Sequence, residues 1–249
     1  MSTLFGFLNI DKPAGLTSRR VVDAVARLVR PAKAGHAGTL DPLATGVLVV
    51  VVGHATRMVP RLHAFAKEYR AVFRLGCRSD TDDVTGNVEP VDLASGPISE
   101  AAVELELASF VGTIEQVPPA YSAVHIDGRR AYERARAGEA VTLAPRTVVI
   151  HGLEITRFEY PELEVVVECG SGTYIRSLGR DLGARLGCGA VMSDLVRTRI
   201  GPYTLEAALP FDELNEASLG QSLLSPLTAI EHLARQVCSD EELELVRNG

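Results

Sequence analysis

The sequence predicts an α+β fold with a mixed, mostly antiparallel sheet, flanking helices and one inserted arm. Strand-like and helix-like segments are interspersed without a strict strand–helix–strand alternation, which favours α+β over parallel α/β architecture. A basic stretch at about 118–145 has little apolar periodicity, so we expect it to project from the core as an insertion. The 249 residues, 46% hydrophobic and 23% charged, suit one large globular domain with at most a small appendage.

The first third alternates short apolar runs with turns. Residues 5–10 are expected as a strand, and Asp11 to Gly15 as a turn. A helix capped by Thr17 or Ser18 should follow and end before Pro31, which cannot continue it. The next expected elements are a loop at 33–45, a buried strand at 46–52, a helix at 55–65, a strand at 67–75 and a polar loop at 78–87.

The second half begins with a helix that Ser99 caps, ending near Phe110. A strand at 113–117 is broken by two prolines, and the basic arm DGRRAYERARAG follows with local helical character. The remaining expected elements are strands at 148–158 and 163–169, a turn at 170–172, a helix at 173–186, a strand at 195–200, and tail helices at 211–217 and 226–236.

Charge is distributed unevenly along the chain. The net formal charge is −7, but residues 12–78 carry twelve Lys/Arg against three acids, a net of +9. Residues 205–249 carry nine acids and two Arg, a net of −7. Such an asymmetry can steer a polyanion to one face, although an ordinary solvated basic surface has the same composition. With no Trp, six Tyr and seven Phe, a broad stacking platform for single-stranded nucleic acid is not expected.

The cysteines and the N-terminus indicate a cytoplasmic protein. No pair of cysteines has C-x-x-C spacing and no Cys/His cluster has a zinc pattern, so we expect reduced, packed thiols and no metal site. No signal peptide is recognisable, and the longest aliphatic run, Val47 to Val52, is far shorter than the ~20 residues of a membrane helix. The cysteines are Cys77, Cys169, Cys188 and Cys238.

The stretch GHAGTLDPLATG, residues 35–46, is the richest in residues that can carry chemistry. It holds three glycines, one histidine and Asp41 beside a buried strand. Glycines let a backbone approach a ligand closely, and Pro42 biases Asp41 toward an extended loop conformation. Catalytic groups often lie on such loops. An Asp-Pro pair is also common in turns, so the pattern alone leaves a turn or capping role open.

This stretch resembles the catalytic motif of the TruB family of tRNA pseudouridine synthases. The motif is long and specific, and the resemblance extends from about Phe7 to Tyr203. Further blocks match in the family's order: NIDKPAGLTS (9–18), KEYRAVFRLGCRSDTDDVTG (67–86), VPPAYSAVHIDGRRAYERARAG (117–138), GSGTYIRSLGRDLG (170–183) and LVRTRIGPY (195–203). The resemblance implies a pseudouridine-synthase-like sheet with an RNA-binding arm.

The resemblance also implies a reaction. Enzymes of this family convert the uridine at position 55, in the T-loop of tRNA, to pseudouridine. They break the N-glycosidic bond, rotate the uracil and rejoin it through carbon, without metal, cofactor or energy source. Asp41 matches the essential aspartate, and the target base must first leave its stack. The residues leave three roles open for Asp41: attack at the base, attack at the sugar, or proton abstraction.

Four further residues match the family's uridine pocket. Arg176 matches the arginine that pairs with the catalytic aspartate and keeps it ionised. Tyr69 matches the tyrosine that stacks on the target base, and Tyr174 and Leu195 match a second pocket tyrosine and an apolar contact to the base. The residues alone also permit plain core packing for these three, and a phosphate contact or surface ion pair for Arg176.

The resemblance assigns RNA contacts to a second group. His36 matches the histidine that enters the T-loop and replaces the flipped base in the stack. Lys12 matches a lysine near the active site, either structural or phosphate-binding. The arm is expected to close over the T-loop and contact phosphates, although a solvated helix face would also be basic. The basic residues of this arm are Arg129, Arg130, Arg134 and Arg136.

The resemblance divides the chain into a catalytic domain at 1–205 and an acidic helical segment at 206–249. Many bacterial members carry an RNA-binding PUA domain after the catalytic domain, and this chain stops about where one would begin, so we expect that domain to be absent or truncated. The expected partner is tRNA, bound by a monomer that requires no protein partner and no membrane. Two other readings remain: an RNA chaperone for tRNA folding, and a synthase acting on ribosomal RNA within a guide-RNA complex.

Overall fold

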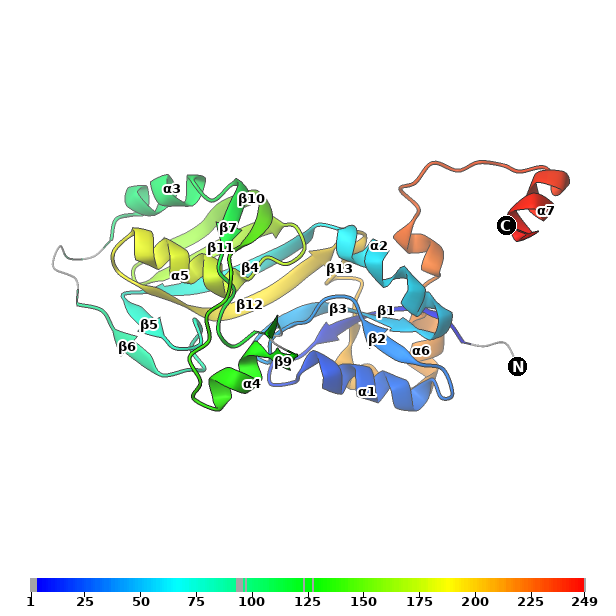
Figure 1. The fold of residues 1–249 in the computed structure, drawn as a ribbon, viewed down its shortest axis with the longest axis horizontal. Coiled ribbons are helices and arrows are strands. Elements are labelled where there is room, and N and C mark those ends of the chain that lie inside the picture. The colour runs from blue at the N-terminus through cyan, green and yellow to red at the C-terminus, as the bar shows by residue number, and fades with distance from the viewer. Residues whose placement is uncertain (1–3, 93–95, 97, 123, 127, 249) are drawn as a thin grey trace.

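One mixed ten-stranded sheet runs through the molecule (Figure 1). The computed structural model describes residues 4–92, 96, 98–122, 124–126 and 128–248. The strand order is β14-β1-β3-β12-β4-β11-β10-β7, with β2 paired to β3 and β13 to β12. Only the β1–β14 and β3–β12 pairs of this sheet are parallel. The predicted α+β fold with a mixed, mostly antiparallel sheet is therefore confirmed.

The strands of this sheet are β1 (Gly6–Lys12), β2 (Ala34–His36), β3 (Thr45–Val52), β4 (Lys67–Leu75), β7 (Gly112–Gln116), β10 (Arg146–Glu159), β11 (Glu162–Cys169), β12 (Ala190–Ile200), β13 (Tyr203–Thr204) and β14 (Leu209–Pro210). Two small hairpins lie outside it: β5 (Cys77–Ser79) with β6 (Val88–Pro90), and β8 (His125–Ile126) with β9 (Arg129–Arg130).

The helices are α1 (Ser18–Leu28), α2 (Val59–Ala64), α3 (Glu100–Ala108), α4 (Ala131–Arg136), α5 (Ile175–Arg185), α6 (Glu216–Ser222) and α7 (Asp240–Asn248), with 3-10 turns η1 (Gly53–Met58), η2 (Phe211–Glu213) and η3 (Pro226–Ala229). None of the helices among the described residues is both long and apolar enough to cross a membrane.

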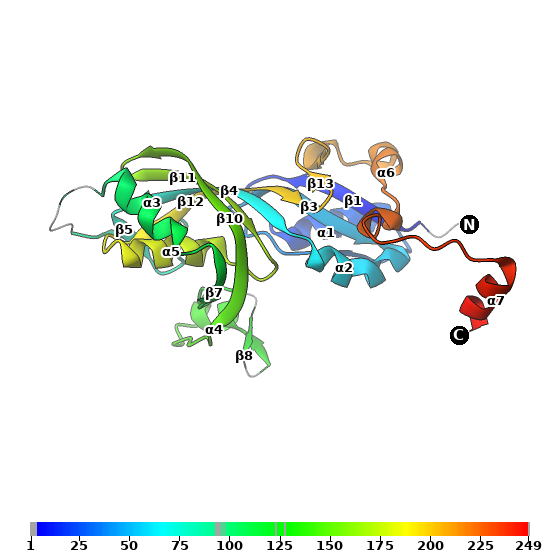
Figure 2. The same ribbon diagram turned by 90° about the horizontal axis from the view of Figure 1, so that it is seen from above.

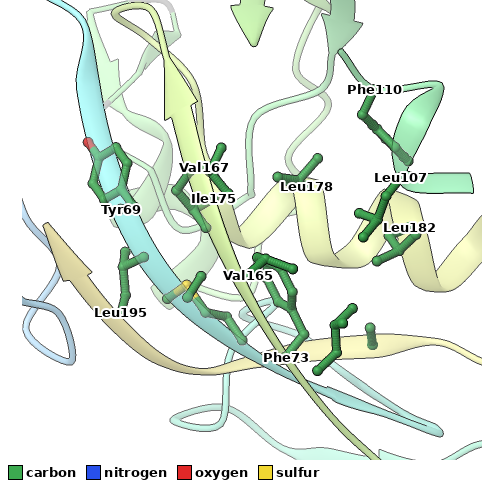
Figure 3. Packing of buried hydrophobic residues seen from close by; sticks show 14 of the residues in the cluster. Tyr69, Phe73, Leu107, Phe110, Val165, Val167, Ile175, Leu178, Leu182 and Leu195 are labelled. Atoms are coloured by element: carbon green, nitrogen blue, oxygen red, sulfur yellow. The ribbon is translucent and has the colours of Figure 1, made fainter. Parts of the chain in front are cut away.

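The sheet has two halves, and a separate group of helices covers each of them. Around β4, β11 and β12, the apolar faces of α3 and α5 close a core that contains Phe73, Leu107 and Leu178 (Figure 3). Around β1 and β3, α1 packs on one face and η1 with α2 on the other. Strand β3 is therefore buried on both sides, which explains the unbroken run from Val47 to Val52.

The arm projects away from the sheet beyond the end of β7, and carries β8, β9 and α4 (Figure 2). Its helix spans only six residues, with Ala131 alone buried. The insertion that the sequence predicted at about 118–145 thus stands out from the core. At the right-hand end of the molecule in Figure 1, α7 lies apart from the body after a long extended segment.

Several sequence-predicted boundaries were wrong. Residues 34–36, expected within a loop, form β2, because they complete the edge of β3 by antiparallel pairing. The helix expected at 55–65 divides into η1 and α2. Strand β12 begins at Ala190 rather than at 195, because its first residues pair with the far end of β4.

The tail also differs from expectation. In place of a helix at 211–217, the chain forms η2 and then α6, which Asn215 caps through bonds from Ala217 and Ser218. In place of a helix at 226–236 there is only η3. Leu227 and Leu233 are largely exposed, and a short helix without a packed apolar face is not stable.

Candidate active site

Asp41 lies on an irregular loop between β2 and β3, and the loop is anchored on both sides of it. Leu40 and Ala44 are buried in the core beneath α5, whereas the Asp41 side chain is 36% exposed. Ser18, at the start of α1, donates its hydroxyl to the carbonyl of Leu40 at 3.0 Å and accepts from the N–H of Leu40 at 2.8 Å. The loop thus presents one carboxylate from a fixed backbone.

Lys12 is fully buried beside the same loop. Its Nζ donates to the carbonyls of Pro13 and Leu16 at 2.9 and 2.8 Å, and to that of Pro42 at 3.5 Å. Burial lowers the pKa of Lys12 to about 8, and the Asp41 carboxylate partly opposes this shift. Lys12 therefore joins the β1–α1 turn to the Asp41 loop, as a structural lysine would.

Arg176 forms an ion pair with the Asp41 carboxylate. Its Nε lies 2.9 Å from Oδ2 of Asp41, and only 6% of the arginine side chain is exposed. The Nε–H is not directed at any acceptor among the described residues, so this contact is an ion pair without a well-aligned hydrogen bond. The first turn of α5 carries the arginine, and thus residues 135 positions apart in the chain meet here.

The guanidinium of Arg176 also holds two other segments. Its Nη1 donates to the carbonyl of Thr81 at 2.8 Å, and its Nη2 donates to the carbonyl of Tyr121, at the root of the arm, at 3.0 Å. The carboxylate of Asp83, 4% exposed, lies 3.6 Å from Nη1. Its Oδ1 accepts from Thr81 Oγ1 and from the N–H of Thr85. One buried arginine therefore lies between two carboxylates.

Tyr69 and Leu195 lie on adjacent strands at one end of the core cluster, with Ile175 from α5 nearby (Figure 3). In the sheet, Gly46 of β3, Arg197 of β12 and Tyr69 of β4 form one row across three strands. Gly46 has φ +94°, and a Cβ there would lie 2.3 Å from the Arg197 carbonyl, so only glycine fits. The row brings Tyr69 to the side of the sheet from which the Asp41 loop emerges.

Arg197 is 1% exposed and fixes the Asp41 loop from below. Its Nη2 donates to the carbonyl of Gly38 at 3.1 Å and its Nε to that of Val47 at 2.7 Å. Its Nη1 lies 3.5 Å from the hydroxyl of Tyr69, and the guanidinium carbon lies 5.9 Å from the centre of that ring. Burial raises the pKa of Tyr69, and Arg197 opposes part of that rise, so the phenol stays protonated at neutral pH.

The other predicted site residues lie around this centre. Tyr174 is the half-buried N-cap residue of α5, two positions before Arg176. His36, in β2, is half-buried, and its Nδ1 has no hydrogen-bond partner among the described residues. Burial, followed by the charge of Arg197, lowers the pKa of His36, which favours the neutral ring.

Two of the arm's basic residues share one acid. Arg129 Nη1 lies 3.0 Å from Glu139 Oε1, and Arg134 Nε lies 2.8 Å from Glu139 Oε2. These two contacts hold the pKa of Glu139 below its usual value, with Arg134 the larger influence. Arg130, in β9, is exposed. Two of the predicted RNA contacts of the arm are thus paired with an acid of the same arm.

Sequence reasoning missed Asp83, Arg197 and Ser18 as parts of the site. Each lies inside a block that carries the family resemblance, but nothing in its local pattern indicates a contact with a residue far away in the chain. An acid in the cluster SDTDD, followed by Gly86, reads as a turn residue. A basic residue in a strand pattern reads as solvent-facing, whereas Arg197 is buried and bonded to carbonyls.

Comparisons with solved structures show which class of enzyme has this fold. The structure resembles that of a Cbf5–Nop10–Gar1 complex with a TM-score of 0.75 and 31% identity, covering 98% of this chain and 67% of that one. It also resembles an archaeal box H/ACA sRNP Nop10–Cbf5 complex, with a TM-score of 0.71 and 28% identity over 99% and 68%. The fold is that of the pseudouridine synthases, enzymes that isomerise uridine in RNA.

Family models then identify the family of pseudouridine synthases to which the chain belongs. Residues 26–175 match the N-terminal domain of the TruB family pseudouridylate synthases, and residues 176–233 match the tRNA pseudouridylate synthase B C-terminal domain. The chain belongs to the TruB family. Two relatives named tRNA pseudouridine synthase B, from Gloeobacter violaceus and Thermobifida fusca, are 47% and 49% identical. Their alignments cover 92% and 84% of this chain, and 80% and 74% of theirs.

Proposed function

We propose that this isomerase acts on uridine 55 in the T-loop of tRNA, with Asp41 as the catalytic carboxylate and without a cofactor. The choice of tRNA is supported by relatives named tRNA pseudouridine synthase B at 40–49% identity. The guide-RNA alternative has weaker support, because the Cbf5 structures are about 30% identical. T-loop position 55 is supported by the resemblance of the stretch around Asp41 to the family's catalytic motif.

The ion pair between Asp41 and Arg176 is the single observation that carries this proposal. A carboxylate needed for covalent or base catalysis must be ionised, fixed and reachable. The Asp41 side chain is 36% exposed, whereas its arginine partner is 6% exposed. The arginine is thus shielded from competing solvent, while the carboxylate remains open to a uridine that has left its stack.

Three apolar or aromatic groups suit the flipped base. Tyr69 has its ring beside Leu195 on the neighbouring strand, and a uracil between an aromatic ring and an aliphatic side chain gains stacking and apolar contact (Figure 3). Tyr174 stands at the start of α5, next to the arginine turn. We assign Tyr69 a catalytic role at the base, and Tyr174, Leu195 and Lys12 roles in binding and arranging the substrate pocket.

The chemistry is an isomerisation and needs no external group. The bond from the ribose anomeric carbon to N1 breaks, a bond from the same carbon to C5 forms, and the C5 proton is released while N1 gains one. Asp41 could form a transient ester or adduct, or could remove a proton, and each route uses an ionised carboxylate held by Arg176. The phenol of Tyr69, whose pKa burial raises further above neutral pH, is the group that we assign to donate or relay a proton.

Binding of RNA uses a wider surface. His36 suits insertion into the T-loop stack, because burial lowers its pKa and favours the neutral ring, and Nδ1 lacks a partner among the described residues. Arg129, Arg130 and Arg134 of the arm are assigned to phosphates of the RNA. We further propose that the enzyme acts as a cytoplasmic monomer, with the catalytic domain at 1–205 and an appended segment at 206–249.

The proposal is tested by mapping pseudouridine in an unmodified tRNA transcript after incubation with the purified protein. We expect modification at position 55 alone, with no added metal or nucleotide. A transcript with cytidine at position 55 is the matched control and should remain unmodified. Modification at another position, or none without a guide RNA, would overturn the assignment of the substrate.

A further inference from the structure

A buried glutamine joins the root of the arm to the start of α5. Gln116, the last residue of β7, is 1% exposed. Its Nε2 donates to the carbonyl of Tyr174 at 3.1 Å, and its Oε1 accepts from the N–H of Tyr174 at 2.8 Å. One planar amide therefore satisfies both main-chain polar groups of a single residue, as a neighbouring strand would.

Over the residues that the structure describes, the start of α5 has no capping side chain of the usual kind. Tyr174 is its N-cap residue and makes no side-chain capping bond, and no acidic residue lies in the first turn. Ser, Thr, Asp or Asn commonly fixes a helix start by its side chain. Here the helix start is fixed by Gln116, which lies on strand β7 and not on the helix itself. Arg176 follows two residues later, so the place of its guanidinium depends on where the main chain of Tyr174 lies.

The segment that follows Gln116 runs along the same helix turn. The carbonyl of Val117 accepts from Ser177 Oγ at 2.9 Å and from Arg180 Nη2 at 2.8 Å. The carbonyl of Tyr121 accepts from Arg176 itself. The chain enters the arm from this segment, so the arm root and the arginine that holds Asp41 are parts of one hydrogen-bonded unit.

We propose that Gln116 is a positioning residue for the isomerisation: its amide fixes the start of α5, and so places Arg176 against Asp41 where the arm leaves the sheet. Among the described residues, the amide is bonded to the main chain of Tyr174 and not to the Asp41 carboxylate. This inference rests on the proposed catalytic role of Asp41. Misplacement of a catalytic group by about 1 Å costs on the order of a hundredfold in rate, which sets the size of the effect to look for.

Substitution by glutamate tests this role, because it turns the amide into a group whose hydrogen bonding depends on pH. An ionised Gln116→Glu side chain can accept from the N–H of Tyr174 but cannot donate to its carbonyl. A protonated carboxyl can do both. Burial and the facing carbonyl raise the pKa of such a carboxyl. The variant should therefore regain the native arrangement as the pH falls.

Single-turnover rates of pseudouridine formation in a T-loop stem-loop are measured from pH 5.5 to 8.5, together with RNA affinity and thermal unfolding. We expect Gln116→Glu to be slower than wild type by about a hundredfold at pH 8. Its rate relative to wild type should rise at least tenfold toward pH 5.5, with RNA affinity within threefold throughout. Gln116→Met should be slow at every pH. Glu115→Gln, an exposed neighbour on the same strand, should match wild type.

Two results would overturn the positioning role: a Gln116→Met enzyme with the wild-type rate, or a Gln116→Glu enzyme whose rate relative to wild type does not change with pH. Loss of RNA affinity with an unchanged single-turnover rate would also overturn it. Should Gln116→Met fail to fold, the pH ratio of Gln116→Glu decides alone. Asp41→Asn measured alongside separates the two claims, since an active Asp41→Asn enzyme refutes the role of Asp41 whatever the Gln116 variants do.

Discussion

Arg176 places its Nε 2.9 Å from Oδ2 of Asp41, yet only 6% of the arginine side chain is exposed, against 36% for the aspartate. The guanidinium is held by the carbonyls of Thr81 and Tyr121, so it stays in place whether or not the carboxylate is engaged elsewhere. The Arg176 guanidinium is therefore fixed, whereas the Asp41 carboxylate is more accessible. This arrangement suits a carboxylate that must move away from its arginine in order to react.

Replacement of this arginine by lysine should separate charge from geometry. Arg176→Lys keeps a positive charge but has one ammonium in place of a planar fork, so it cannot reach Asp41 and both carbonyls together. We expect the single-turnover rate to fall about a hundredfold, with RNA affinity within a few-fold of wild type. Arg185→Lys, at the exposed end of α5, is the matched control. Equal rates in the two variants would show that charge alone suffices.

The pH dependence of the rate should report on Lys12. Burial lowers its pKa to about 8, so above that pH the ammonium loses its proton and its strong bonds to the loop carbonyls weaken. We expect the rate to fall above pH 8. In Lys12→Arg, which keeps its charge, the fall should move to higher pH. Lys67, also buried with a pKa lowered to about 8, donates to the carbonyls of His63 and Phe65 and to the hydroxyl of Ser171, and Lys67→Arg should retain the wild-type profile.

The contribution of Lys12 to stability should change with pH in the opposite direction to its effect on the rate. Its pKa in the folded state, about 8, lies below the unfolded value of 10.5. Between these values the unfolded chain binds more protons, so the contribution of Lys12 to the free energy of unfolding rises with pH. A rate that falls above pH 8 while thermal stability follows it downward would mean that unfolding, and not Lys12, causes the loss.

Removal of the Glu139 charge should strengthen RNA binding by the arm. Its carboxylate is paired with Arg129 and Arg134, both assigned to phosphates, so the RNA must compete with it. Glu139→Gln is expected to bind a T-loop stem-loop several-fold more tightly at low salt, with a steeper dependence of affinity on salt concentration. Glu104→Gln makes the same change of net charge at an exposed position of α3, outside the arm. If both variants bind equally tightly, only net charge matters.

Gly179 in α5 should be essential for the packing of this helix against β4. A Cβ at Gly179 would lie 2.5 Å from the ring of Phe73, so Gly179→Ala must push α5 away from β4. We expect a loss of about 1–3 kcal/mol in the free energy of unfolding, and slower catalysis because Arg176 moves with the helix. Gly220→Ala in α6, where nothing lies within 4 Å of the added atom, should be neutral or stabilising. Denaturant titration of both variants checks this.

Much of this site was predictable from short-range patterns. The loop from Gly35 to Gly46 carries its glycines, histidine and Asp-Pro pair within one block, and the apolar run of β3 follows directly. Long regular elements such as β4 and α5 were predicted within two residues of their observed bounds, because their periodicity is local. The family motif then assigned roles that no periodicity could.

The rest depends on contacts between distant residues. Gln116 meets Tyr174 across 58 positions, and Arg176 meets Thr81 across 95. A polar residue at the end of a strand looks exposed in the sequence, and its burial becomes visible only when the helix start lies against it. Strand β2 was missed for a related reason, since its three residues have no alternation of their own and are strand-like only through pairing with β3.

The most direct test of the central claim is the rate of pseudouridine formation at position 55 of tRNA with wild-type protein and with Asp41→Asn. This substitution keeps size and loop geometry but removes the charge that faces Arg176. We predict a loss of at least about a thousandfold in the single-turnover rate, with tRNA affinity within a few-fold of wild type. An Asp41→Asn enzyme that forms pseudouridine at the wild-type rate would contradict the account.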